Sequence, residues 1–128
     1  MNKKIKIVKI SGQYYHGNIS IIVGDKDLMK KHIKKKYDMT TEWIDETGAW
    51  GNAKALEISI SGDVHYIIWM ESFSSKTHEI ALLVHELFHL TVKVLRDTGF
   101  TFSKDSEEAY TYYLQYVTQE ALIKLGKK

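Results

Sequence analysis

Residues 78–99 read "HEIALLVHELFHLTVKVLRDTG" and form the longest apolar segment of the chain. Thr77, directly before the segment, is a candidate N-cap, and Gly99 stands where glycine commonly ends a helix. Between Ile80 and Leu95 the apolar residues fall on nearly every side of a helical wheel, and a helix that is apolar all round is normally buried. The segment therefore predicts one long helix at the centre of the fold.

The remaining segments predict a sheet and two further helices. Alternating or β-branched stretches indicate four strands, at residues 4–10, 18–23, 55–61 and 64–70. Further helices are expected at residues 24–39 and 103–126. This order of elements indicates an α+β fold in which a small, mostly antiparallel sheet packs on the central helix and the C-terminal helix that follows it.

Composition limits the classes of function. The 128 residues suit one domain, and 44% apolar with 27% charged residues is a soluble globular composition. No run reaches the roughly 18 apolar residues of a membrane span, and a net charge of +2 gives no reason to expect nucleic acid. Cysteine is absent and no signal peptide is recognisable, so we expect a cytoplasmic protein. A transition metal would have to be held by His, Asp or Glu.

The word "HELFH" at residues 85–89 has the spacing of a catalytic zinc site. Residues four apart on a helix lie about 6 Å apart along its axis and about 40° apart around it, so His85 and His89 can reach one Zn²⁺. Glu86 is then placed beside a zinc-bound water and can act as its general base. Two buried imidazoles and a carboxylate would be costly in an apolar helix unless a metal and its water satisfied them.

A third protein ligand is needed, and the sequence offers several candidates. The metzincin pattern HExxHxxGxxH is excluded, because Val92 and Leu95 stand where its Gly and last His would be. Asp97 lies two turns after His89, but its position beside the helix end favours a structural role. Glu107 and Glu108, at the start of the next helix, are better candidates, since that helix can turn back onto the first.

Helical-wheel positions leave the two glutamates open. Glu107 shares the most apolar stripe of its helix, which favours an inward direction. Glu108 shares a stripe with small polar residues, including Thr111 and Gln115, and a metal-facing side of a helix should be small and polar. The residues alone support either choice.

Two quoted stretches resemble a known family. "LLVHELFHLTVKVLRDTG" (82–99) followed by "SEEAYTYYLQYV" (106–117) is similar to the small zinc metallopeptidases encoded by bacteriophages and prophages. The resemblance covers about residues 55–120. It implies a zincin-like fold of the gluzincin type and a Glu-Ala-Tyr-like motif whose glutamate binds zinc. On this chain that motif places the third ligand at Glu108, beside His85 and His89.

The expected function is therefore hydrolysis of a peptide-type bond in a peptide or protein substrate, with zinc as cofactor. A zincin-like domain of phage or prophage origin that only binds or assembles is the alternative, although an intact Glu86 favours the enzyme. Supporting roles are conceivable for His78 at the cleft, Tyr112 as a phenol near the reacting carbonyl and Trp50 as an aromatic wall. The strand at 64–70 is expected to be an edge strand that an extended substrate can join.

Overall fold

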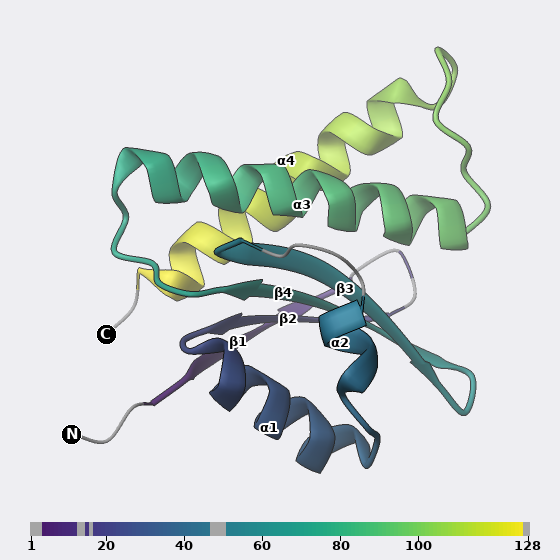
Figure 1. Ribbon diagram of the computed structural model, residues 1–128. Coiled ribbons are helices and arrows are strands. Elements are labelled where there is room, and N and C mark those ends of the chain that lie inside the picture. Colours follow the sequence, from purple (N-terminus) through teal and green to yellow (C-terminus); the bar gives the residue numbers. More distant parts are fainter. Residues whose placement is uncertain (1–3, 13–14, 16, 47–50, 127–128) are drawn as a thin grey trace.

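Four strands form one mixed sheet in the computed structural model, which describes residues 4–12, 15, 17–46 and 51–126 (Figure 1). They are β1 (Lys6–Ser11), β2 (Asn18–Val23), β3 (Ala53–Ile60) and β4 (Asp63–Met70), in the spatial order β1-β2-β4-β3. The pairs β1–β2 and β3–β4 are antiparallel, whereas β2 and β4 run parallel. Between the parallel strands β2 and β4 the chain passes through two helices and the edge strand β3, and this long connection allows β4 to run in the same direction as β2.

Helices cover both faces of this sheet (Figure 1). They are α1 (Lys26–Tyr37), α2 (Glu42–Glu46), α3 (Thr77–Asp97) and α4 (Glu107–Leu125). α1 and α2 pack on one face, and α3 and α4 pack on the other. The fold is thus α+β with three layers, and the short α2 is an element that the sequence patterns did not predict.

The expectation that the strand at 64–70 lies at an edge is wrong. This strand is β4, which pairs with β2 on one side and β3 on the other. Along it Tyr66, Ile68 and Met70 pack under α3 and α4, while Ile67 and Trp69 pack under α1 and α2. Burial on both faces explains why the strand is a continuous apolar run. The edge beside α3 belongs to β3.

The entry into α3 is fixed by a buried carboxylate rather than by the expected Thr77 cap. The side chain of Glu79 accepts hydrogen bonds from Ser74 N (2.6 Å), Ser74 Oγ (2.9 Å), Ser72 Oγ (3.0 Å) and Lys76 N (3.3 Å). These donors, led by the Ser74 backbone N–H, lower the pKa of Glu79 to about 2. Glu79 therefore binds the loop before α3 to the first turn of the helix and sets where the helix begins.

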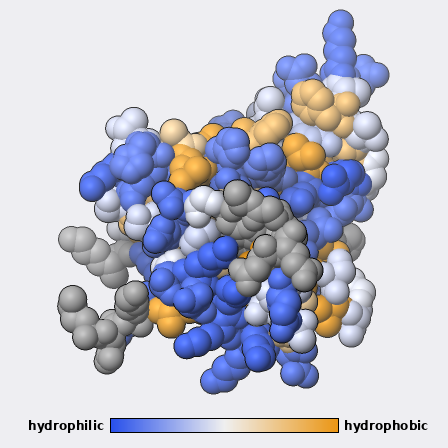
Figure 2. All heavy atoms as spheres, viewed as in Figure 1, coloured by the Kyte–Doolittle hydropathy of each residue, from blue (hydrophilic) through white to orange (hydrophobic). Residues whose placement is uncertain are grey.

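The surface differs between the two helical layers. Figure 2 shows apolar side chains gathered along α3 and the start of α4, whereas the surface over α1 is largely hydrophilic. The exposed large apolar side chains of α3, α4 and their connection are Phe88, Phe100, Phe102, Tyr112 and Ile123. In the part of the chain that the structure describes, no helix combines the length and the apolar character needed to cross a bilayer.

Candidate metal centre

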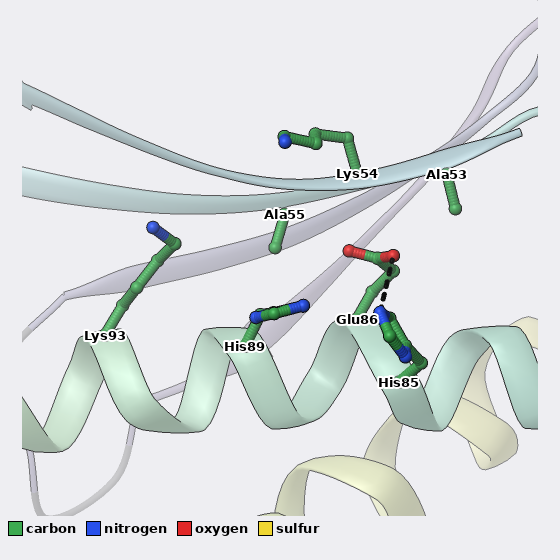
Figure 3. Close-up of a pocket in the computed structure, with 7 residues that line it drawn as sticks. All are labelled: Ala53, Lys54, Ala55, His85, Glu86, His89 and Lys93. Atoms are coloured by element: carbon green, nitrogen blue, oxygen red, sulfur yellow. Dashed lines mark ion pairs between the residues drawn. The ribbon is translucent and has the colours of Figure 1, made fainter. Parts of the chain in front are cut away.

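A cavity of about 300 Å³ lies between α3 and the edge strand β3 (Figure 3). It is lined by Ala53, Lys54, Ala55, His85, Glu86, His89 and Lys93. Ala53 and Ala55 point from β3 toward α3, and their small side chains leave room above the helix. All three candidate site residues of the word HELFH, His85, Glu86 and His89, therefore line one cavity.

The two histidines stand as neighbours on α3. Their ring centroids are 4.9 Å apart, and the rings meet edge to face at 74°. The side chain of His85 is 64% exposed, and His89 is exposed as well. Because neither ring is enclosed by the core, both imidazoles are accessible to an ion that enters the cavity.

Glu86 combines burial with proximity to the histidines. Its side chain is only 8% exposed, and its Oε2 lies 3.9 Å from Nε2 of His85. Figure 3 shows its carboxylate directed toward β3, above the helix axis. A carboxylate held this far from water is costly without a compensating charge. An ion bound at His85 and His89 would supply that charge, and the two imidazoles offer two of the ligands that a zinc ion requires.

The candidate carboxylate ligands are not grouped with the histidines. Within residues 4–12, 15, 17–46 and 51–126, no three His, Cys, Asp or Glu side chains lie together in a way that could hold a metal ion. Glu107 and Glu108 are both exposed in the first turn of α4, and neither lines the cavity. The structure therefore places two imidazoles at the cavity and leaves Glu107 and Glu108 outside it.

The packing of α4 does not separate the two glutamates. Its buried face consists of Tyr110, Tyr113, Val117, Ala121 and Leu125. Glu107 continues this face but lies beyond its packed part. Glu108 lies on the opposite side, where Thr111, Tyr112, Gln115 and Gln119 are exposed as well. Both glutamates are therefore exposed to solvent, and their exposure does not favour one over the other as a ligand.

Asp97, the remaining candidate ligand, is hydrogen-bonded to the sheet. Its Oδ2 accepts a hydrogen bond of 2.8 Å from the Tyr66 hydroxyl. Its carboxylate also contacts Glu57 of β3. Burial, followed by the hydrogen bond and the charge of Asp97, raises the pKa of Glu57 to about 7. These contacts give Asp97 the structural role that its place at the helix end suggested.

The supporting residues have different outcomes. His78 is exposed in the first turn of α3 and does not line the cavity. Tyr112 is 65% exposed on the outer side of α4, away from the cavity lining. Trp50 lies outside the described residues.

Sequence patterns missed the lysines of the cavity. Lys93 follows His89 by four residues and so shares its helix face, and Figure 3 shows its amine directed toward β3. This spacing was a signal that could have identified it. Lys54 and the two alanines come from β3, and only the pairing of the sheet reveals that this strand adjoins α3.

Comparisons of the chain with family models, with curated proteins and with solved structures gave no match. What the site does is therefore inferred from its own residues.

Proposed function

We propose that the chain is a zinc-dependent metallopeptidase with a zincin-like fold, in which His85, His89 and Glu108 hold the metal and Glu86 is the general base. One observation carries this proposal. The buried carboxylate of Glu86 shares an open cavity with two adjacent imidazoles. A purely structural zinc site closes with four protein ligands and has no need of such a carboxylate.

The residues divide the chemistry between them. Zinc, when bound, lowers the pKa of a coordinated water and polarises a substrate carbonyl. Neutral imidazole nitrogens of His85 and His89 supply two of its ligands. Glu86 accepts a proton from the attacking water and transfers it to the leaving amine, as a general base that becomes a general acid.

The edge strand supports a peptide as the substrate. β3 is an edge strand of the described sheet, and it runs alongside the cavity. An extended peptide can pair with such an edge through its backbone, which would place a peptide bond over Glu86. The methyl groups of Ala53 and Ala55 leave space for the substrate chain. Lys93 adds positive charge at the end of the cavity beyond His89.

The alternative is a zincin-like binding or assembly domain without catalysis. The exposed position of Glu107 and Glu108 favours this alternative, since an incomplete ligand set would bind zinc weakly. The two functions differ in what they require of Glu86. Only the peptidase depends on its carboxylate.

The test is Glu86→Gln in the zinc-loaded full chain, assayed on a mixture of unstructured peptides with product analysis by mass spectrometry. Glutamine keeps the shape of the side chain and removes the base. We expect zinc content and fold to be unchanged and cleavage to fall by about 10²–10⁴-fold, the usual contribution of a general base. Glu71→Gln, at an exposed carboxylate after β4, is the matched control. Cleavage by Glu86→Gln at the wild-type rate, or no cleavage by the wild type, would contradict the proposal.

A further inference from the structure

A second cavity, of about 220 Å³, lies on the other face of the sheet, under the C-terminal end of α1. Its polar lining residues come from three strands and one helix: Lys9, Asn18, Ser20, Lys36, Tyr37 and His65. It is separated by the sheet from the cavity of His85 and His89. Nothing in the proposed peptidase chemistry uses it.

Strand register explains why polar groups gather there. Ile7 and Ile22 lie on the α1 face of the sheet and pack against the second core. Two residues further along the same face, Lys9 of β1 stands directly opposite Ser20 of β2. One step beyond, Asn18 stands opposite His65 of β4. The face thus changes from an apolar core to a row of hydrogen-bond donors.

The charges in this cavity are unusual because they repel one another. The side-chain amines of Lys9 and Lys36 come within interaction distance of each other, although they belong to β1 and α1. Burial, followed by the charge and contact of Lys9, lowers the pKa of Lys36. Burial, followed by the charges of Lys36 and Lys9, lowers the pKa of His32. Of the described residues, no acidic side chain lines the cavity or contributes to these shifts.

The C-terminal end of α1 explains only some of the positive charge at this cavity. Lys34, Lys35 and Lys36 occupy the last turn of α1, where positive charge interacts favourably with the helix dipole. That effect does not explain why β1 adds a further lysine at the same place. Nor does it explain Ser20, a hydroxyl residue that is only 8% exposed and lines the same cavity. Two cations beside neutral donors form the environment that an oxyanion requires.

We propose that this cavity binds the phosphoryl group of a small molecule. A dianionic phosphoryl group would neutralise both Lys9 and Lys36 and accept hydrogen bonds from Asn18 and Ser20. Monovalent anions would leave one ammonium group uncompensated. Because Lys9 and Lys36 are exposed, the phosphoryl group can carry an organic substituent that extends into solvent.

The direct test is an NMR titration of the full chain with inorganic phosphate at constant ionic strength and pH. We expect saturable shifts of the backbone amides of Lys9, Ser20 and Lys36, with a Kd on the order of 1 mM or tighter. Phosphoserine and adenosine 5′-monophosphate are titrated in parallel, with serine and adenosine as controls. The probe that binds most tightly identifies the source of the phosphoryl group. No saturable binding of any phosphoryl probe would overturn the proposal.

Variants separate a built site from general attraction to positive charge. Lys9→Gln and Lys36→Gln are expected to weaken phosphate binding by at least tenfold, whereas Lys35→Gln, in the same turn of α1 but outside the cavity, should bind like the wild type. In phosphate-free buffer, Lys36→Gln should unfold at the wild-type temperature or above, because it removes a repulsion. Phosphate should raise the unfolding temperature of the wild type but not of Lys36→Gln. An equal response of all three variants to phosphate would overturn the site.

Discussion

The hydroxyl of Tyr66 donates a hydrogen bond of 2.8 Å to Oδ2 of Asp97, and so joins the central strand β4 to the last residue of α3. Glu57 of β3 lies against the same carboxylate. At the other end of α3, Glu79 ties the first turn to the preceding loop. Both ends of the helix are therefore fixed by carboxylates, and the histidine pair lies between them.

The Glu57–Asp97 contact predicts a pH dependence of stability. The pKa of Glu57 is raised to about 7 from 4.5, so the folded protein holds a proton that the unfolded chain releases. Its contribution to stability is complete below about pH 4.5 and is lost as the pH rises through about 7. Glu57→Gln mimics the protonated form. We expect the free energy of unfolding of the wild type, measured with urea, to decrease from pH 5 to pH 8, and that of Glu57→Gln to decrease less. Equal decreases in the two proteins would contradict the prediction.

Removal of the Tyr66 hydroxyl should destabilise the fold. Tyr66→Phe keeps the buried ring and deletes the hydrogen bond to a charged partner. The expected loss is about 1–2 kcal/mol at pH 7, toward the lower end for such bonds, because the exposed Asp97 regains water. Tyr112→Phe is the control, since Tyr112 is 65% exposed. Urea unfolding measures both variants, and equal midpoints would show that the bond contributes nothing.

Glu79 predicts the opposite pH dependence. Its pKa is lowered to about 2 from 4.5, so its contribution to stability is present above about pH 4.5 and is lost as the pH falls through about 2. Glu79→Gln should lower the unfolding midpoint at pH 7, and its difference from the wild type should shrink toward pH 2. Glu71→Gln, at an exposed site, should change neither. A Glu79→Gln difference that is the same at pH 7 and pH 3 would contradict this role.

The histidine pair predicts one zinc ion per chain. His85→Ala and His89→Ala each remove a ligand, so each should lose more affinity than the 10–100-fold typical of outer-shell partners. Competitive titration with a chromophoric chelator measures the affinity, and elemental analysis gives the stoichiometry. His78→Ala on the same helix should bind zinc like the wild type, because His78 lies outside the cavity. Equal zinc binding by all four proteins would exclude a site at this pair.

The third ligand is tested with Glu107→Gln and Glu108→Gln in the same titration. Adjacent residues on a helix point about 100° apart, so only one can meet the ion held by the histidines. We expect the larger loss for Glu108→Gln. Because Glu108 is exposed outside the cavity, zinc binding should also draw the first turn of α4 toward α3 and slow amide exchange there. A larger loss for Glu107→Gln would assign the ligand to Glu107.

Local patterns were sufficient for most elements. The strand predicted at 18–23 and the helix predicted at 78–99 agree with β2 (Asn18–Val23) and α3 (Thr77–Asp97) to within two residues. Helical spacing also placed His85, Glu86 and His89 on one side of α3, because that geometry depends only on rise and rotation per residue. The last helix begins at Glu107, four residues after the predicted start at 103, because Ser103 N donates a hydrogen bond to Ser106 Oγ in the turn before it.

What the sequence determined by itself thus depends on neighbours along the chain: the long apolar helix, the strand segments and the histidine pair with its glutamate. Only the tertiary structure decided that β3 and not β4 is the edge strand beside α3, because strand order depends on pairings between distant segments. It also brought Lys9 and Lys36 together from β1 and α1, and joined Tyr66 to Asp97 across 31 residues. Such contacts have no periodic signature, since each depends on how two elements cross rather than on the spacing within either one.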